Sequence, residues 1–147
     1  MSEQSKSRVL NLLALLRAAH LIHHTAHLQA SGATSYADHQ LFARLYGDLV
    51  EEADGLAEKL VYLAGADSVD ALDQVLRIHT AVRRAVEASP ELVQRSYLLE
   101  QSVQAAIAAA RDGYASEGGL PLGLDNYLAG LADAHDTACY LLRQRLA

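Results

Sequence analysis

Apolar positions recur with helical spacing along almost the whole chain. In the first segment an apolar stripe is continued by histidines; its members are Val9, Leu12, Leu13, Leu16, His20, His23, His24 and His27. The opposite side is also apolar, with Leu15 and Ile22 on it. A helix that is apolar nearly all round is buried on several sides. We therefore expect a helix over residues 5–30, ended by Ser31-Gly32, that makes subunit contacts as well as core contacts.

The remaining pattern predicts four more helices. They are expected over residues 36–64, 68–88, 90–114 and 125–146. Gly65 closes the first of these, and the segment SEGGLPLG separates the last two. Ser89 as N-cap with Pro90 in the first turn is a start signal for the helix over 90–114.

This order of elements predicts an all-α protein. Four long helices, with a short extra helix in the connection between the second and third, are typical of a four-helix bundle with a crossover. The composition agrees, because Leu and Ala dominate and the chain has only two Pro and no Trp. A length of 147 residues suits a single domain over residues 1–147.

The net charge and the number of cysteines argue against two classes of function, nucleic-acid binding and thiolate metal binding. The formal net charge of -6 argues against a dedicated nucleic-acid binder, and the segment MSEQSKSR offers only Lys6 and Arg8. We expect weak DNA binding or none. Cys139 is the only cysteine, which excludes an intrachain disulfide and a thiolate metal cluster.

No segment is predicted to enter a membrane. The apolar run near the N-terminus is interrupted by charges and histidines, and no convincing signal-peptide cleavage site follows it. No other segment approaches the apolar length of a membrane span. We expect a soluble, cytoplasmic protein.

One face of the helix over 36–64 mixes metal-binding groups with small residues. The face is formed by Tyr36, His39, Ala43, Gly47, Val50, Asp54, Glu58 and Val61. Small residues let a second helix approach closely. Gly47 lies near the midpoint of His39 and Asp54, and glycine inside a helix costs about 0.5–1 kcal/mol relative to alanine. A two-fold crossing of two chains at Gly47 explains its presence; the alternative is that it is merely tolerated.

Four side chains have the chemistry of a small metal site. Asp54 and Glu58 are carboxylates four apart on one helical face, and His27 and His39 flank the first turn. Each pair alone is more typical of a solvated face or of ordinary hydrogen bonding. Along helices, His39 and Asp54 are roughly 22 Å apart, so one chain cannot bring them to one ion. Two antiparallel copies can.

The spacing of these four residues resembles that of a known family. The stretch AHLQASGATSYADHQLFARLYGDLVEEADGLAEKLVYLAG is similar to the Dps mini-ferritins, in which a histidine ending the first helix is followed twelve residues later by another and then by Asp and Glu four apart. AHL before the turn, Gly in the turn and the ending D-x-x-A-E-K/R also match. The run LDNYLAGLADAHDTACYLLRQRL resembles the family's last helix.

The resemblance implies a fold, an activity and an assembly. The fold is a ferritin-like bundle, assembled as a hollow dodecamer with a metal site shared across a two-fold interface. The activity is oxidation of Fe(II), preferably with hydrogen peroxide, and storage of ferric mineral, which protects against oxidative stress. It assigns His27, His39, Asp54 and Glu58 as both ferroxidase residues and iron ligands. His23 and His24 are expected either as auxiliary ligands or as ordinary interface groups.

The chain departs from the family pattern at a ligand position. Ala43 stands where the family usually has an acidic residue four positions after the second histidine, and Asp38 points about 100° away from His39. The alternative hypothesis is therefore a Dps-like shell whose site is impaired or holds zinc. Leu28 replaces a frequent Trp, which leaves Tyr36 or Tyr46 to quench radicals. His135 lacks a carboxylate three positions before it, so no metal site is expected in the centre of one bundle.

Overall fold

The computed structural model describes all residues from 1 to 147 and contains helices and connections but no β-strand. The predicted all-α class is confirmed. The helices are α1 (Glu3–Gln29), α2 (Ser35–Gly47), α3 (Leu49–Ala64), a short 3-10 helix η1 (Ala66–Ser68), α4 (Ala71–Ala88), α5 (Leu92–Ala115) and α6 (Leu122–Leu146).

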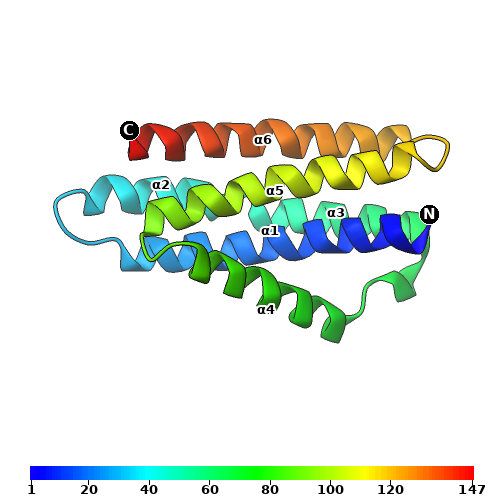
Figure 1. Cartoon of the computed structure of the whole chain (residues 1–147), viewed down its shortest axis with the longest axis horizontal. Coiled ribbons are helices and arrows are strands. Elements are labelled where there is room, and N and C mark those ends of the chain that lie inside the picture. The colour runs from blue at the N-terminus through cyan, green and yellow to red at the C-terminus, as the bar shows by residue number, and fades with distance from the viewer.

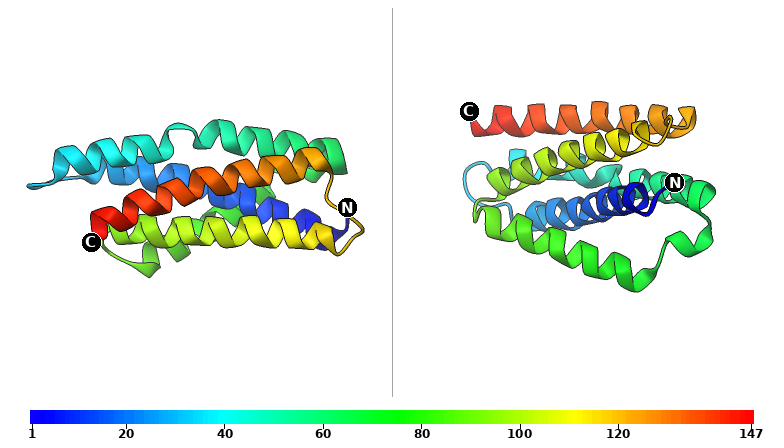
Figure 2. Two further views of the ribbon diagram at one scale, coloured as in Figure 1. Left: turned by 90° about the horizontal axis from the view of Figure 1, so that it is seen from above. Right: turned by 45° about the vertical axis from the view of Figure 1, so that its right-hand side comes forward.

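The long helices run along one axis of an elongated molecule (Figure 1). Helix α1 lies at the centre of the packing and contacts α2, α3, α4 and α5. Helix α6 packs on α5 and touches α3. Helix α4 lies outside this group, against α1 and α5, and connects the end of α3 to the start of α5 (Figure 2).

The apolar side chains of α1 form a large part of the hydrophobic core. As expected from its pattern, α1 is buried on several sides, and Leu12 and Leu16 are completely enclosed. Leu21 and Leu28 nevertheless remain exposed on its outer side. None of the helices combines the length and the apolar character needed to cross a lipid bilayer.

The predicted helix over 36–64 is divided into α2 and α3. Gly47 ends α2, and Asp48 has φ -98° and ψ -8°, which breaks the regular helix for one residue. Glycine and aspartate both have low helix propensity, so the interruption falls where the sequence is weakest. Leu45 and Leu49 are buried on either side of it, and the two helices continue in nearly the same direction (Figure 2).

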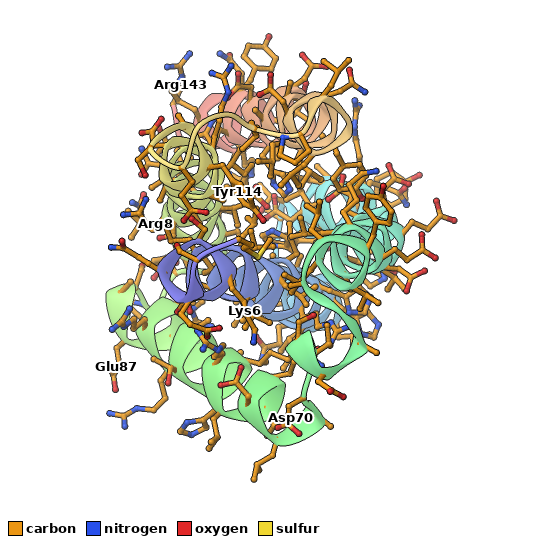
Figure 3. All side chains as sticks on the ribbon, turned by 90° about the vertical axis from the view of Figure 1, so that its right-hand side faces the viewer. Lys6, Arg8, Asp70, Glu87, Tyr114 and Arg143 are labelled. Atoms are coloured by element: carbon orange, nitrogen blue, oxygen red, sulfur yellow. The ribbon has the colours of Figure 1, made fainter.

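Two helix starts differ from the predicted ones. Helix α4 begins after Asp70, whose carboxylate accepts a hydrogen bond from the Asp73 N–H at 2.8 Å, which makes Asp70 the N-cap. Helix α5 begins at Leu92 with Glu91 as its N-cap, whereas Ser89 is the C-cap of α4 and its hydroxyl accepts from the Glu91 N–H. Figure 3 shows α4, marked by Asp70 and Glu87, at the edge of the molecule with many side chains directed outward.

Helices α3 and α6 approach closely at Gly55. The Tyr127 hydroxyl of α6 donates to the Glu52 carbonyl of α3 at 2.8 Å, and this places its ring against Gly55. A Cβ added at Gly55 would lie 2.9 Å from Tyr127 Cζ, closer than real Cβ contacts. The residue is therefore small because another helix occupies the space.

The substitution Gly55→Ala is expected to destabilise the fold by about 1–3 kcal/mol, as overpacking does. The alanine methyl would push Tyr127 away from the Glu52 carbonyl. Gly130→Ala in α6 is the matched control, since nothing lies within 4 Å of a Cβ there. Urea unfolding should show a lowered midpoint for Gly55→Ala alone; equal midpoints for the two variants would contradict the close contact.

Candidate metal centre

A small apolar cluster fixes the turn between α1 and α2. The cluster contains Ala26 of α1, Phe42 and Leu45 of α2, and Leu142 of α6, and Phe42 is 0% exposed. It is separate from the larger core, which lies along the rest of α1. The second half of α2 is thus packed against the last turns of α1 and α6, at the end of the molecule where Figure 1 places the C-terminus.

An ion pair adds to this anchoring. Arg145 of α6 donates from Nε to Asp38 Oδ1 at 2.6 Å and from Nη2 to Asp38 Oδ2 at 3.1 Å. Thr34 also donates to the Asp38 carboxylate. The Arg145 hydrogen bond lowers the pKa of Asp38 despite the opposing effect of burial. Because His39 follows Asp38 directly, this ion pair also positions His39.

The structure brings His27 and His39 into direct contact. Their rings stack with centroids 3.5 Å apart. The Nδ1–H of His27 donates to the His39 carbonyl at 2.8 Å, and the Nδ1–H of His39 donates to the His27 carbonyl at 2.9 Å. The two hydrogen bonds are reciprocal and hold the end of α1 to the start of α2.

These bonds determine which nitrogen is free to bind a ligand. A carbonyl oxygen only accepts, so Nδ1 carries the proton on both rings. In the neutral imidazole, Nε2 then has the free lone pair, which is the form that binds metal ions. A backbone carbonyl on the other nitrogen is also a usual orienting partner of a metal-bound histidine. The Nε2 atoms of His27 and His39 could thus serve as nitrogen ligands.

Further imidazoles continue this pair along α1. The His24 ring lies 6.3 Å from that of His27, and the His20 ring lies 6.0 Å from that of His24, measured between centroids. Tyr46 of α2 packs edge-on against His20, His24 and His27. Burial, followed by the charges of His24 and His23, lowers the pKa of His20, which favours its neutral form.

The two carboxylates lie apart from the His27–His39 pair. Asp54 and Glu58 are exposed on α3, and Asp54 lines a hollow of about 300 Å³ together with His20 and Arg17. No group of three or more His, Cys, Asp or Glu side chains within one chain is arranged to hold a metal ion. One chain therefore offers a pair of imidazoles and, separately, a pair of carboxylates.

His23 is placed differently from its neighbours. It is 0% exposed, and its ring contacts Ser96 Oγ through Nδ1 at 3.1 Å and Glu100 Oε1 through Nε2 at 2.6 Å. Both nitrogens are thus engaged with α5. His23 is not available as an auxiliary ligand to the His27–His39 pair, whereas His24 remains beside it.

A buried polar network links four helices around Glu100. The Glu100 carboxylate, 1% exposed on α5, binds His23 of α1 and accepts from His135 Nδ1–H of α6 at 2.5 Å. On its other side, His135 Nε2 lies 3.3 Å from Glu52 Oε2 of α3. A cavity of about 220 Å³, lined in part by Arg44 and Asp48, leads from the surface to Glu52, Glu100 and His135.

The network changes the pKa of its members in opposite directions. Burial would raise the pKa of Glu100, but the hydrogen bonds with His135 and His23 outweigh it and lower this pKa to about 2. Burial would likewise lower the pKa of His135, but Glu100 and Glu52 raise it to about 9. Near neutral pH the centre of the bundle thus contains a buried ion pair.

This network was not predicted from the sequence, which singled out His135 only to reject it as a metal ligand. A signal was present: Ser96 and Glu100 are four apart on the same side as Leu99 and Val103, which are core residues. A glutamate on an apolar stripe indicates a buried partner. That partner lies 35 residues away in the sequence, so local spacing does not identify it.

No protein-family model, curated protein or solved structure significantly matches the chain. A functional proposal therefore depends on the geometry and chemistry of the chain itself.

The buried ion pair predicts a defined dependence of stability on pH. The contribution of Glu100 should be present above about pH 4.5 and be lost as the pH falls towards 2, because its pKa is lowered on folding. The contribution of His135 should be present below pH 6.5 and be lost as the pH rises through about 9, because its pKa is raised.

Chemical unfolding between pH 3 and 10 checks this expectation. The variant Glu100→Gln should lose stability most between about pH 4.5 and 6.5, which flattens the profile. Glu87→Gln is the matched control, since Glu87 pairs with Arg83 at the exposed surface of α4. A Glu100→Gln profile parallel to that of the unmodified protein would rule out the buried ion pair.

Proposed function

We propose that this protein is a Dps-type mini-ferritin, an iron-storing cage that oxidises Fe(II) with hydrogen peroxide at sites shared between subunits. The observation that carries the proposal is the His27–His39 pair, in which reciprocal carbonyl bonds leave both Nε2 atoms free for metal. It occurs where the resemblance to the Dps family places the two nitrogen ligands.

The arrangement of the helices supports a ferritin-like bundle. Helices α1, α2 with α3, α5 and α6 provide the four long members, and α4 lies in the connection between the second and third of them. This is the element order of a four-helix bundle with one crossover. The extra helix predicted in that connection corresponds to α4.

The surface of α1, α2 and α3 supports an interface between copies of the chain. Large apolar side chains are exposed there: Leu21, Leu28, Tyr36, Val50 and Val61. Gly47 has no atom within 4 Å of the position of a Cβ, so the space beside it is open to a second helix. A two-fold axis near Gly47 carries Asp54 and Glu58 of one copy towards His27 and His39 of the other. Isologous contacts of this kind are the usual basis of symmetric assemblies.

The completed site has chemistry suited to Fe(II). Two imidazole nitrogens and two carboxylates can bind a divalent ion once the stacked His27 and His39 rings, 3.5 Å apart between centroids, move apart. Two Fe(II) ions each give one electron to hydrogen peroxide, which takes up two protons and becomes two water molecules. When both electrons reach the same peroxide, which requires a second Fe(II) close to the first, no hydroxyl radical is released. The ferric product then adds to the stored mineral.

The alternative function is a shell whose site holds zinc. Ala43 favours this alternative, because its methyl group supplies no ligand where the family usually has a carboxylate. Two nitrogens and two oxygens complete a tetrahedral zinc site. Such a shell has the same mass as the ferroxidase, but it should oxidise Fe(II) no faster than buffer does.

Ligand removal is expected to slow iron oxidation strongly. His39→Ala and Asp54→Ala should each reduce the rate of peroxide-dependent Fe(II) oxidation at least tenfold, because each removes a direct ligand. The matched control is His79→Ala, since His79 is exposed on α4, away from α2 and α3. Ferric absorbance reports the rate, and light scattering reports the mass. A monomeric protein, or unchanged oxidation in both variants, would contradict the proposal.

Mixed assemblies test whether the ligands come from different chains. If His39→Ala and Asp54→Ala chains are co-expressed with different tags, a dimer of one of each contains one intact site and one doubly damaged site. Random pairing should restore about a quarter of the sites, although each variant alone has none. Oxidation at about a quarter of the unmodified rate is expected. No recovery in the mixed assembly would contradict a shared site.

A further inference from the structure

His20 and His24 form a second pair of metal-binding groups. They are four residues apart on α1, half-buried, with ring centroids 6.0 Å apart. The rings of His23, His27, His39 and His135 are all engaged in hydrogen bonds with protein groups. The rings of His20 and His24 have no such bond, so their nitrogens are available to a ligand.

The spacing of this pair suits one transition-metal ion. Histidines four apart on one helical face project side by side and bind a single zinc ion in helical motifs. With metal–nitrogen bonds of about 2 Å, two imidazoles on one tetrahedral ion have centres about 5 Å apart. The observed 6.0 Å is close to this separation, so a small rotation of the side chains brings both rings to one ion.

Carboxylates are present next to the pair. The hollow of about 300 Å³ between α1 and α3 is lined by His20, Glu51 and Asp54, with Arg17 also at its wall. Two carboxylates against one guanidinium favour a cation at this position. The hollow therefore provides a local negative charge and space for water beside the His20 ring.

Tyr46 holds the imidazoles in place. Its ring lies 5.8 Å from that of His20 and 5.0 Å from that of His24, and both contacts are edge-on. Packing against an aromatic ring restricts the side-chain rotamers before a ligand binds. A preorganised pair loses less conformational entropy on binding than two free surface histidines do.

We propose that His20 and His24 hold a second divalent transition-metal ion, one helical turn along α1 from the His27–His39 pair, with water completing its coordination. The ion belongs to the class that prefers imidazole, such as zinc or Fe(II). The site is separate from the one in the proposed function and needs no ligand from His27 or His39. This further role rests on the proposed function: Ala43 supplies no ligand for a second ion at the shared site, and His20 and His24 bind that ion instead.

Zinc stoichiometry tests the proposal. The metal-free assembled protein is dialysed against Zn²⁺ with excess Mg²⁺, which occupies sites made only of carboxylates, and bound zinc is measured by mass spectrometry. The unmodified chain should bind two zinc ions. The double variant His20→Gln/His24→Gln should bind one, and so should His27→Gln/His39→Gln.

His79→Gln is the control, since it removes an exposed histidine of α4 and should leave two ions bound. Circular dichroism shows whether each variant is folded. If His20→Gln/His24→Gln binds as much zinc as the unmodified chain, the proposal is overturned.

A second measurement uses the unmodified chain and so does not depend on how the variants fold. Anomalous scattering at the zinc edge, from crystals soaked in Zn²⁺, should show an ion between His20 and His24. Zinc found only at His27 and His39 would overturn the proposal. Failure of the proposed function is recognised separately, because an unmodified assembly that does not oxidise Fe(II) still reports its zinc stoichiometry and positions.

Discussion

The buried carboxylate of Glu100 constrains the relative positions of the helices more than any other single group does. An ionised group in the interior is tolerated only when it is paired and hydrogen-bonded. Glu100 meets this condition by binding His23 of α1 and His135 of α6, and His135 in turn faces Glu52 of α3. If any of these helices slid by one turn, a buried polar group would lose its partner, at a cost of several kcal/mol. Apolar packing alone tolerates such shifts more easily. The register of α1, α3, α5 and α6 is therefore fixed by polar contacts.

Most helices were predictable because their signals are local. Apolar spacing in α1 and the glycines of the segment before α6 depend only on neighbouring residues, and the structure follows them within a few positions. The interruption at Asp48 was not predicted, since the apolar stripe of Leu45 and Leu49 continues across it. The prediction of Ser89 as the N-cap of the helix over 90–114 was wrong. Its sequence fits an N-cap, but Glu91 occupies that position.

The site was predictable in part. The short turn after α1 indicated that His27 and His39 approach each other. The hydrogen bonds that orient their rings go to backbone carbonyls at both helix ends, so the spacing of residue types does not predict them. The histidines of α1 show a further limit. At about 100° per residue, His23 lies only 60° from His20 on the helix. That difference is enough to bring His23 to Glu100 while His20 stays beside Tyr46, and only the surrounding helices determine it.

Helix α6 carries none of the proposed ligands, yet it is tied to α2 and α3, which carry His39, Asp54 and Glu58. Its Arg145 binds Asp38 at the start of α2, and its Tyr127 binds the Glu52 carbonyl near the start of α3. These attachment points are eighteen residues apart on one continuous helix, or about 27 Å. Helices α2 and α3 are interrupted at Asp48, and α6 adds a second connection between them. The length of α6 between two side chains thus helps to set the distance between the imidazole end and the carboxylate end of the chain, a distance that a second copy would have to match in the proposed assembly.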